Sequence, residues 1–269
     1  LEIGQPDFPT PPPICEAAAE AVRQGQTRYT PNAGTIQLRS AIAAHLRRSK
    51  QVDVTEEEIV VTTGGMGALA STFQAILDAG DEVLLPDPGW PNYAMQVSCA
   101  GGVPRYYTLP AERDFQPLLE EIESLITQRT RAILVNSPSN PTGAVFSEEV
   151  ASGLLALAGR RGLLVISDEV YEEIVFDGSS PSFVRPPSVP YTVGIYSFSK
   201  SYAMTGWRVG YLVAPRPLAE QITKLQEVFY ACASSVSQAA ALAALEVDRG
   251  YVREMVSAYR RRRDILDEE

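Results

Sequence analysis

The pattern that most constrains the fold is a regular alternation of short apolar runs with longer amphipathic stretches. The apolar runs, which we expect to form strands, cover residues 59–63, 82–85, 103–109, 132–135, 163–166, 193–198 and 208–213. The expected helices cover residues 14–24, 35–49, 68–77, 92–100, 118–126, 148–160, 218–229 and 237–269. Strands that are apolar throughout are buried on both faces, and intervening helices allow parallel pairing. The sequence therefore predicts an α/β protein with a mostly parallel sheet sandwiched by helices.

Composition and charge narrow the classes of function. The chain has 269 residues, 45% of them hydrophobic, which is enough for a sizeable core. The formal net charge of -10 argues against broad binding to nucleic acids or anionic membranes. The one basic run, residues 260–263, lies in a charged helical stretch and is expected to be a solvated helix face. We expect neither a membrane span nor a signal peptide.

Cysteine and histidine usage narrows the classes further. Cys15, Cys99 and Cys232 lie far apart without a CxxC motif, which favours a reducing compartment, so we expect a cytoplasmic protein. His45 is the only histidine, which argues against a histidine-based metal site and against a Ser-His-Asp triad. We therefore expect no metal centre.

Polar residues follow several of the predicted strands at the point where each strand ends. Gly64 and Gly65 follow the run 59–63, the segment 136–140 follows the run 132–135, and Asp168 and Lys200 come just after two later runs. Ligands of open α/β sheets bind beyond the carboxyl ends of the strands. These four groups are therefore expected to meet at one crevice.

Lys200 indicates the chemistry of that crevice. It closes the run Tyr196-Ser197-Phe198-Ser199-Lys200, and Arg208 follows eight residues later. A lysine amine forms a Schiff base with a carbonyl cofactor, whereas two hydroxyls and a guanidinium hold a phosphate dianion. An aldehyde that carries a phosphate meets both requirements, so the pattern indicates pyridoxal 5'-phosphate (PLP).

Two further clusters each allow a structural and a functional interpretation. The junction at Gly64 to Gly67 offers backbone N–H groups at a helix start, suited to a phosphate, but it is also typical of a tight turn, and it is not a P-loop. Asp168 ends an apolar strand, where its carboxylate can pair with a protonated pyridine nitrogen or simply cap a helix or form a salt bridge.

Asn140 and Trp90 also have two interpretations each. The segment Asn140-Pro141-Thr142-Gly143 is typical of a turn, and the Asn140 amide can also donate to a phenolate oxygen or a substrate carboxylate; we expect both roles. Trp90 lies on a proline-rich loop after a strand, where it can stack on a flat cofactor or pack as an ordinary loop tryptophan.

Together these motifs match a known family. The chain resembles the fold-type-I PLP-dependent aminotransferases of class I/II, close to the aspartate-aminotransferase-like branch, from Ile3 to its end. The motifs that carry the resemblance are Tyr29-Thr30-Pro31-Asn32-Ala33-Gly34, Gly64-Gly65-Met66, Ser137-Pro138-Ser139-Asn140-Pro141-Thr142-Gly143, Ser167-Asp168-Glu169-Val170-Tyr171, and Ser197-Phe198-Ser199-Lys200 with Gly206-Trp207-Arg208-Val209-Gly210.

The resemblance implies three catalytic residues, Lys200, Asp168 and Tyr171, and further residues that bind the cofactor. Lys200 resembles the Schiff-base lysine that later moves the proton, and Asp168 resembles the partner of the pyridine nitrogen. Tyr171 and Asn140 resemble the pair that hydrogen-bonds the phenolic oxygen of PLP. Trp90 resembles the aromatic residue that stacks on the ring.

The resemblance also implies the phosphate site, part of the substrate site and a homodimer. The residues similar to the phosphate cup are Gly65, Met66, Ser197, Ser199 and Arg208. Tyr29 is similar to a tyrosine that reaches the phosphate of the neighbouring subunit. Gly4 resembles the glycine that lies over the substrate carboxylate, so the implied substrate-binding residues are Gly4, Trp90 and Asn140.

The implied function is the transfer of an amino group from an L-amino acid to a 2-oxo acid, by a ping-pong mechanism through a Schiff base on Lys200. The family clamps the substrate α-carboxylate with an arginine in a C-terminal small domain, which we expect to lie outside this sequence, since the chain stops inside a helical stretch. We expect residues 1–34 to form an arm and interface segment, 35–250 the PLP-binding large domain, and 251–269 the helix that leads to the small domain.

Three alternatives stay open at this point. A PLP enzyme of the same fold can catalyse other chemistry, such as C–S bond elimination or a cyclisation. The run Ser197 to Lys200 also fits the S-x-x-K pattern of penicillin-recognising hydrolases, although the chain has neither S-D-N nor K-T-G, and Ser197 is expected to follow a strand rather than open a helix. A PLP-binding effector module without turnover is the third.

Overall fold

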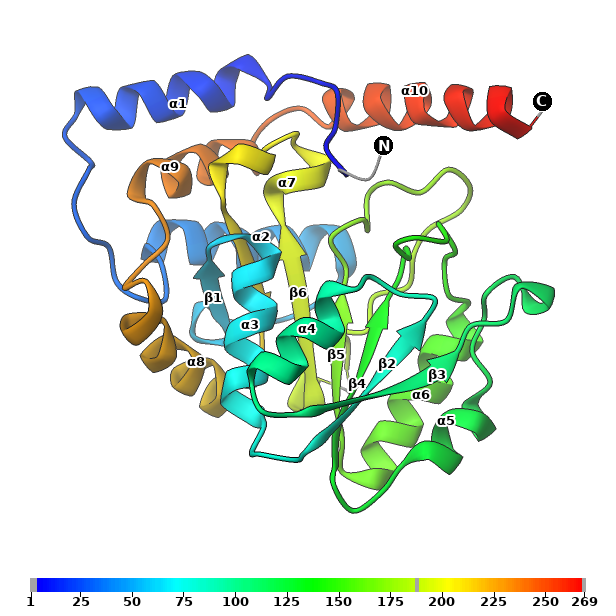
Figure 1. Cartoon of the computed structure of the whole chain (residues 1–269). Helices are drawn as coiled ribbons and strands as arrows, with labels where there is room; N and C mark the ends of the chain where they lie inside the picture. Colours follow the sequence, from blue (N-terminus) through cyan, green and yellow to red (C-terminus); the bar gives the residue numbers. More distant parts are fainter. Residues whose placement is uncertain (1–3, 187–188, 268–269) are drawn as a thin grey trace.

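The structure, a computed structural model, describes residues 4–186 and 189–267 (Figure 1). The helices are α1 (Pro12–Arg23), α2 (Ile36–Lys50), α3 (Gly64–Ile76), α4 (Asn92–Cys99), α5 (Leu119–Leu125), α6 (Glu148–Arg161), α7 (Phe198–Ser201), α8 (Arg216–Phe229), α9 (Ser235–Ala244) and α10 (Gly250–Asp267). The strands are β1 (Ile59–Thr62), β2 (Glu82–Asp87), β3 (Val103–Thr108), β4 (Thr130–Asn136), β5 (Leu164–Asp168), β6 (Thr192–Ser197) and β7 (Gly210–Val213). Short 3-10 helices are η1 (Glu56–Glu58), η2 (Ala111–Arg113), η3 (Val189–Tyr191) and η4 (Thr205–Trp207).

The strands form one sheet in the order β1-β7-β6-β5-β4-β2-β3. The pairs from β6 through β5, β4 and β2 to β3 are parallel, whereas β7 runs antiparallel to both of its neighbours. The predicted α/β fold with a mostly parallel sheet is therefore confirmed. Because β4, β5 and β6 run in the same direction, their carboxyl ends lie at one edge of the sheet, and that edge holds the cavity described below.

Helices cover both faces of the sheet. Strand side chains alternate between faces, so that Val60 packs with α3, α4 and α8, whereas its neighbours Ile59 and Val61 pack with α1, α2 and α9. A third cluster joins α5 and α6 to the same sheet through β4 and β5. The central strands are buried along almost their whole length, which explains why their sequences read as unbroken apolar runs.

Two expectations about element bounds in the C-terminal part of the chain are wrong. The helix expected over residues 237–269 is broken, because α9 ends at Ala244 and α10 begins at Gly250. The Asp248 carboxylate accepts a hydrogen bond of 3.0 Å from the Gly250 N–H and so starts a new helix. The strand expected from Arg208 begins instead at Gly210, since Arg208 adopts a left-handed conformation with φ of 50°. The end of the predicted helix, residues 268–269, lies outside the described part.

The N-terminal segment lies across the carboxyl edge of the sheet. Helix α1 packs along α9, and the residues before it run past α7 (Figure 1). Thr10 ties this segment down, since its hydroxyl donates to the Ala203 carbonyl at 2.7 Å and accepts from the Trp207 indole at 3.1 Å. The division into segments 1–34, 35–250 and 251–269 stays a prediction. Within the described residues, no helix has the length and apolar character needed to cross a membrane.

Candidate active site

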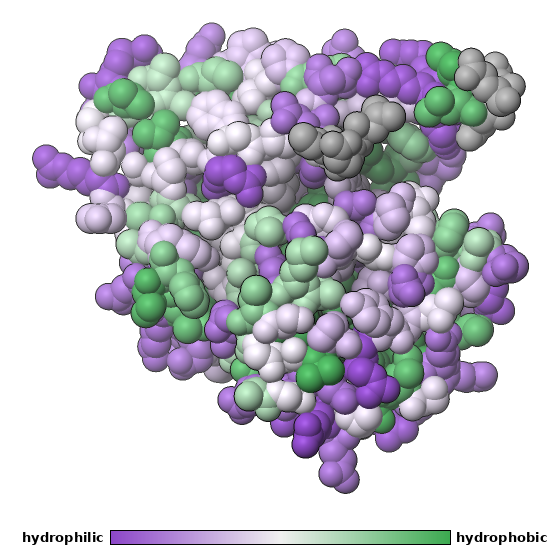
Figure 2. All heavy atoms as spheres, viewed as in Figure 1, coloured by the Kyte–Doolittle hydropathy of each residue, from purple (hydrophilic) through white to green (hydrophobic). Residues whose placement is uncertain are grey.

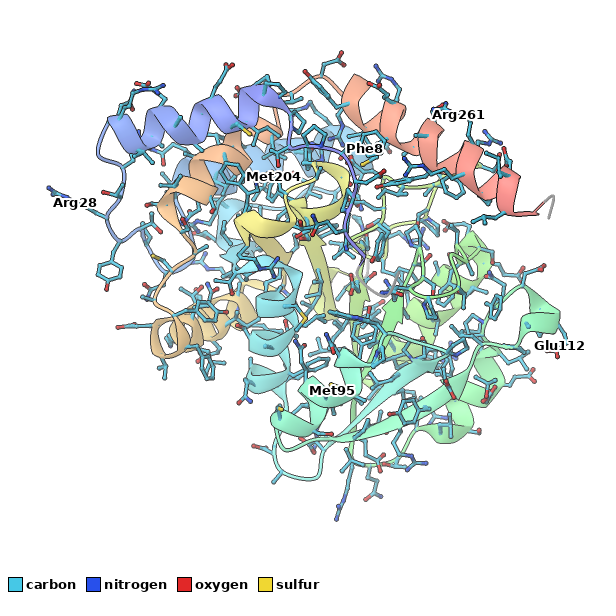
Figure 3. The ribbon with its side chains drawn as sticks, turned by 45° about the horizontal axis from the view of Figure 1, so that its top comes forward. Phe8, Arg28, Met95, Glu112, Met204 and Arg261 are labelled. Atoms are coloured by element: carbon cyan, nitrogen blue, oxygen red, sulfur yellow. The ribbon has the colours of Figure 1, made fainter. Side chains whose placement is uncertain are left out.

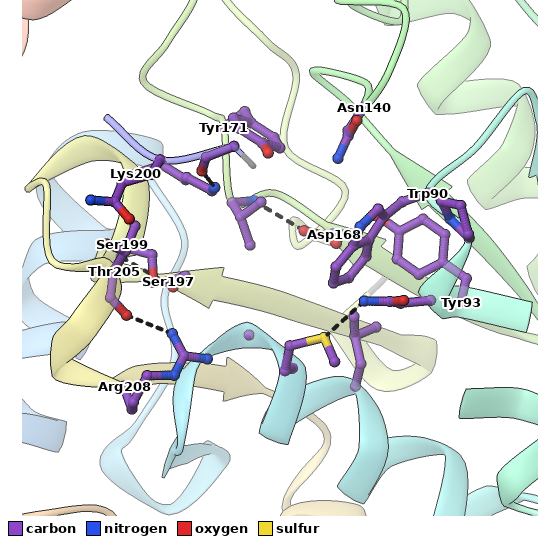
Figure 4. A pocket seen from close by; sticks show the side chains of 18 residues that line it. Trp90, Tyr93, Asn140, Asp168, Tyr171, Ser197, Ser199, Lys200, Thr205 and Arg208 are labelled. Atoms are coloured by element: carbon purple, nitrogen blue, oxygen red, sulfur yellow. Dashed lines mark hydrogen bonds between the residues drawn. The ribbon is translucent and has the colours of Figure 1, made fainter. Parts of the chain in front are cut away.

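One cavity of about 560 Å³ lies at the carboxyl edge of the sheet (Figure 4). Its size is in the usual range for a cofactor with a small substrate. The predicted site residues that line it are Gly4, Gly65, Met66, Trp90, Asn140, Asp168, Tyr171, Ser197, Ser199, Lys200 and Arg208. Residues as far apart in the sequence as Gly65 and Lys200 therefore meet here, as the strand-end pattern predicts, and Gly4 joins them from the N-terminal segment.

Lys200 enters the cavity from the short helix after β6. Ser197 closes that strand, and its hydroxyl accepts a hydrogen bond of 3.1 Å from the Ser199 N–H, which starts α7. The Lys200 ammonium donates to the Gly4 carbonyl and lies 5.4 Å from the centre of the Tyr171 ring. Burial lowers the pKa of Lys200, and the nearby Arg208 charge adds to this, while Asp168 opposes it. The lysine is therefore closer to its neutral, nucleophilic form than an exposed lysine would be.

Asp168, the last residue of β5, is almost completely buried in the cavity wall. The Tyr93 hydroxyl donates to one carboxylate oxygen at 2.7 Å, and the Val170 N–H donates to the other at 3.2 Å. Burial raises the pKa of Asp168 to about 6, although both hydrogen bonds lower it. A carboxylate that is short of solvation in this way pairs strongly with a cation placed beside it.

The opposite end of the cavity is suited to an anion. Helix α3 begins at Gly64, four residues earlier than expected, so Gly65 and Met66, which line the cavity, lie in its first turn, where backbone N–H groups have no partner within the helix. A Cβ at Gly64 would lie 2.8 Å from the Arg208 guanidinium, so glycine at this position lets the guanidinium approach the helix start. Arg208 is itself oriented by donating to the Thr205 carbonyl at 2.7 Å. A helix N-terminus and a guanidinium are groups that favour an anion, as the predicted phosphate site requires.

Asn140 and Trp90 lie on the far wall of the cavity (Figure 4). Trp90 packs edge-to-face on Tyr93, with ring centres 5.3 Å apart and planes at 85°. The Asn140 N–H donates to the Asn136 side chain at 2.7 Å, and the Asn136 amide donates to the Asp168 carbonyl at 3.1 Å. Asn136 therefore connects the Asn140 turn to the strand that carries Asp168.

Gly4 is the residue at which the N-terminal segment contacts Lys200. A Cβ at this position would lie 3.2 Å from the Lys200 ammonium nitrogen and 3.7 Å from the Tyr171 hydroxyl. A side chain at this position would make Lys200 or the N-terminal segment shift by a few tenths of an ångström. The place of Gly4 over the substrate stays a prediction.

Tyr29 is the one predicted site residue that lies away from the cavity. Its side chain is 89% exposed. The loop around it is nevertheless fixed, because the buried side chain of Gln238 donates to the Thr30 hydroxyl at 2.9 Å and accepts from the Thr35 N–H at 2.8 Å. Arg28, the preceding residue, points away from the body of the protein (Figure 3).

The sequence did not reveal two buried residues, Tyr93 and Asn136, and one expectation about Ser197 is wrong. Tyr93 carried no signal, since it lies in an amphipathic helix far from Asp168 in sequence. Asn136 lies in the polar segment 136–140 that follows a predicted strand. Its side chain accepts a hydrogen bond from the Asn140 N–H and donates one to the Asp168 carbonyl, and the second bond depends on the pairing of β4 with β5. Ser197 was expected to follow a strand without opening a helix; in fact it does both, because it also caps α7. The missing S-D-N and K-T-G motifs still argue against the hydrolase alternative.

Comparison with known proteins decides the family. A family model described as aminotransferase class I and II matches residues 1–269. The chain belongs to the class I and II aminotransferases. It is 40% identical to the aspartate aminotransferase of Thermotoga maritima, over 100% of this chain and 71% of that protein. It is 43% identical to the aspartate/prephenate aminotransferase of Thermus thermophilus, over 99% of this chain and 70% of that protein.

Solved structures of aminotransferases share the same fold. A double mutant of the Thermus thermophilus aspartate aminotransferase superposes with a TM-score of 0.97 at 41% identity, and covers 99% of this chain. The structure of the aspartate aminotransferase from Thermotoga maritima gives a TM-score of 0.95 at 40% identity, and the match covers 99% of this chain and 70% of that chain. This aminotransferase accordingly uses PLP and transfers amino groups between amino acids and 2-oxo acids. The relatives favour transamination over elimination and over a non-catalytic effector role.

Proposed function

We propose that this aminotransferase uses Lys200 as its cofactor-binding and proton-transferring residue, with an acidic amino acid such as aspartate as amino donor. One observation carries the assignment of Lys200: the Lys200 amine and the buried Asp168 carboxylate face the same cavity, whose remaining end is formed by Arg208 and the start of α3. The choice of donor is supported by the relatives, which are described as aspartate or aspartate/prephenate aminotransferases, one of them solved with the dicarboxylate maleate.

The cavity fits PLP at each of its polar groups. Arg208, Ser197, Ser199 and the N–H groups of Gly65 and Met66 would hold the phosphate. Asp168 would face the ring nitrogen, since its carboxylate has a pKa raised to about 6 by burial and gains from a cationic partner. PLP supplies an aldehyde that condenses with an amine and a ring that accepts electrons from the substrate carbon.

Lys200 would act both as the attachment point and as the base. Its pKa is lowered by burial, so a larger fraction is neutral and able to take a proton from the substrate Cα. The Gly4 carbonyl accepts a hydrogen bond from the amine and so aims it into the cavity. The same amine can return the proton to a neighbouring atom, because it lies at the end of a flexible side chain.

Tyr171 and Asn140 would bind the phenolic oxygen of the cofactor. Burial and the Asp168 charge raise the pKa of Tyr171, so its hydroxyl stays protonated and can donate a hydrogen bond. The ring of Trp90, held by Tyr93, would stack on the cofactor, and Gly4, Trp90 and Asn140 would border the substrate.

We also propose a homodimer in which Tyr29 reaches the phosphate of the neighbouring subunit. An 89% exposed tyrosine on a loop fixed by two buried glutamines, Gln238 and Gln226, is suited to a partner rather than to solvent. Exposed apolar side chains of α8 add to this, since Val228 is 79% and Phe229 is 54% exposed. On the face seen in Figure 2, hydrophobic residues form separate patches among polar ones.

A cytoplasmic location completes the proposal. Cys15, Cys99 and Cys232 are all free, and the first two are exposed. Exposed free thiols are typical of proteins kept in a reducing compartment.

An absorbance titration tests the proposed function. The purified protein is loaded with PLP, and its near-ultraviolet and visible spectrum is recorded before and after adding aspartate, glutamate, alanine or phenylalanine in turn. We expect a visible band from the lysine Schiff base that collapses fastest with aspartate, together with recovery of the matching 2-oxo acid. A band that never forms would overturn the cofactor assignment, and a band that responds only to non-acidic amino acids would overturn the choice of donor.

A further inference from the structure

The turn after β5 presents side chains to two opposite sides. Asp168 and Tyr171 line the cofactor cavity, whereas Glu169 and Glu172, one residue later in each case, lie outside it. Both glutamates contact one cation, the ammonium of Lys50 at the end of α2. Lys50 lies 2.5 Å from one oxygen of Glu169 and forms an ion pair with Glu172 as well. The cluster Lys50–Glu169–Glu172 is not part of the cavity and has no place in the mechanism given above.

Glu169 is the most heavily bonded carboxylate of this cluster. Its side chain is 2% exposed. One oxygen accepts from the Ser182 hydroxyl at 3.1 Å and from the Phe183 N–H at 3.0 Å, and the Ser167 hydroxyl donates to it at 3.1 Å. The other accepts from the Tyr196 hydroxyl at 3.3 Å and from Lys50. These five donors fix the side chain of Glu169, the residue next to Asp168, in place.

Lys50 supplies a cation that both glutamates contact. Its side chain is 14% exposed, and its ammonium lies 4.8 Å from the centre of the Tyr196 ring. As the last residue of α2, it also stands where the helix dipole favours a positive charge. Without this ammonium, two carboxylates with little access to water would face each other and repel.

Movement of the glutamates would be passed on to the cofactor side through a short piece of backbone. The Glu172 N–H donates to the Glu169 carbonyl at 3.1 Å, and the Ile174 N–H donates to the Tyr171 carbonyl at 2.8 Å, so residues 169–174 form one tight turn. The Glu169 N–H is in turn bonded to the Ile195 carbonyl at 3.0 Å. Asp168 is bonded covalently to Glu169, and Tyr171 to Glu172. A shift of either glutamate would therefore displace its neighbour in the cavity.

We propose that Lys50 is a positioning residue of the PLP site. By forming ion pairs with Glu169 and Glu172 outside the cavity, it holds the Asp168 carboxylate and the Tyr171 phenol in the positions from which they would contact the cofactor. This inference rests on the proposed roles of Asp168 and Tyr171. It predicts that the affinity for PLP and the spectrum of bound PLP depend on a residue that does not touch the cofactor.

Three variants of the PLP-loaded protein test this proposal. Lys50→Met keeps an unbranched side chain that is one atom shorter and removes the charge, and Lys50→Arg restores the charge. The matched control is Arg47→Met, which removes a cation from the same helix, where Arg47 pairs with Asp53 at 2.6 Å on the surface. For each variant we would measure urea unfolding of the apo-protein, PLP affinity by titration, the visible band of bound PLP, and kcat and KM.

We expect Lys50→Met to bind PLP about tenfold or more weakly than wild type and to shift its visible band, while Lys50→Arg recovers most of both and Arg47→Met matches wild type. A purely structural cluster would give a different result. It would lower the stability of Lys50→Met and leave the PLP affinity and spectrum of the folded protein unchanged, which would overturn the proposal.

A fourth variant covers the case in which Lys50→Met does not fold. Glu172→Gln leaves Lys50 paired with Glu169 and releases only the Tyr171 end of the turn. We expect about threefold weaker PLP binding with a shifted band, and wild-type values would overturn the proposal. If wild-type protein gives no PLP band, the proposed function itself is overturned. If wild-type protein gives the band and both Lys50→Met and Glu172→Gln give the same band with the same PLP affinity, this inference alone is overturned.

Discussion

The Tyr93 hydroxyl donates a hydrogen bond of 2.7 Å to the Asp168 carboxylate, and both groups are almost completely buried. This contact joins α4 to the end of β5 behind the cofactor cavity. The bond lowers the pKa of Asp168 against the larger effect of burial, which raises it to about 6. By opposing the effect of burial, the Tyr93 hydrogen bond favours the ionised carboxylate, which is the form that the proposed pairing with the ring nitrogen needs.

Tyr93→Phe should weaken both cofactor binding and turnover. A hydrogen bond to a charged group contributes about 1.5–3 kcal/mol, so we expect kcat/KM and PLP affinity to fall roughly 10- to 100-fold. With the bond gone, the pKa of Asp168 rises further, so PLP affinity should begin to fall at a higher pH than in wild type when the solution is acidified. Titration of the apo-protein with PLP across a pH series measures both effects.

A second buried tyrosine provides the control for that prediction. The Tyr107 hydroxyl donates to the Leu134 carbonyl at 2.9 Å within the same sheet and does not border the cavity. Tyr107→Phe should cost some stability and leave the pH dependence of PLP binding as in wild type. Equal effects of the two substitutions would show that the Asp168 contact has no special role.

Asp168→Asn should make the apo-protein more stable at neutral pH while it destroys activity. Burial raises the pKa of Asp168 from 3.8 to about 6, so its contribution to folding is fully present below the unfolded pKa and is lost as the pH rises through about 6. Replacing the buried charge should therefore raise the free energy of unfolding near pH 7. We expect a gain on the order of 1–2 kcal/mol and not more, because one amide N–H of the new side chain would face a donor and offset part of the gain.

Urea unfolding of the apo-protein at several pH values checks this sign. The difference between Asp168→Asn and wild type should shrink as the pH falls from about 6 towards 3.8, because the wild-type carboxyl becomes neutral. Turnover by the loaded variant should be about 10²- to 10⁴-fold lower. A variant less stable than wild type at neutral pH would show that the carboxylate is well solvated in the apo-protein.

Lys200→Ala should abolish turnover. Without the amine there is neither an attachment point nor a base in the cavity, and we expect a loss of about 10⁴-fold or more together with the visible Schiff-base band. Lys224→Ala, which removes an exposed lysine of α8, should leave both unchanged. Full activity of Lys200→Ala would be incompatible with the assignment.

The elements that the sequence predicted well are those whose burial depends on local pattern alone. Runs such as residues 132–135 lie inside β4, because a strand buried on both faces must be apolar at every position. The polar residues at strand ends met in one cavity because parallel strands share a carboxyl edge, and this follows from topology without knowledge of any side chain.

What the sequence did not predict depends on contacts between distant segments. Tyr93 and Asp168 lie 75 residues apart, and Lys50 and Glu169 lie 119 apart, so neither pair leaves a local signal. The break before α10 depends on one capping carboxylate, that of Asp248, inside a stretch with uniform helical periodicity. The start of α3 at Gly64 also opposes local propensity, since glycine is a poor helix former and is held there by its surroundings.

Gly4→Ala should impair the site through a single methyl group. The new Cβ would lie 3.2 Å from the Lys200 nitrogen, so the N-terminal segment or the lysine must shift, and we expect kcat/KM to fall about tenfold. Gly206→Ala is the matched control, because nothing lies within 4 Å of a Cβ there. Steady-state kinetics of the two variants decide the point, and a Gly4→Ala enzyme as active as Gly206→Ala would mean that the segment before α1 does not border the substrate.

A mixed-dimer experiment tests whether Tyr29 serves the neighbouring subunit. Tyr29→Ala removes a phenol that is 89% exposed in the single chain, so its stability should match wild type, while PLP affinity should fall about tenfold if the phenol binds the phosphate. Chains that carry Tyr29→Ala and chains that carry Lys200→Ala are co-expressed with different affinity tags, and dimers that contain both are purified.

Each such dimer would contain one site with an intact Lys200 that receives Tyr29 from the other chain, and one site that lacks both. At PLP concentrations too low to fill the Tyr29→Ala homodimer, the mixed dimer should therefore show about half of the wild-type activity, although each parent is nearly inactive. Activity no higher than the mean of the two parents would show that Tyr29 acts within its own chain or not at all, because only exchange across a dimer interface can assemble a complete site from two defective chains.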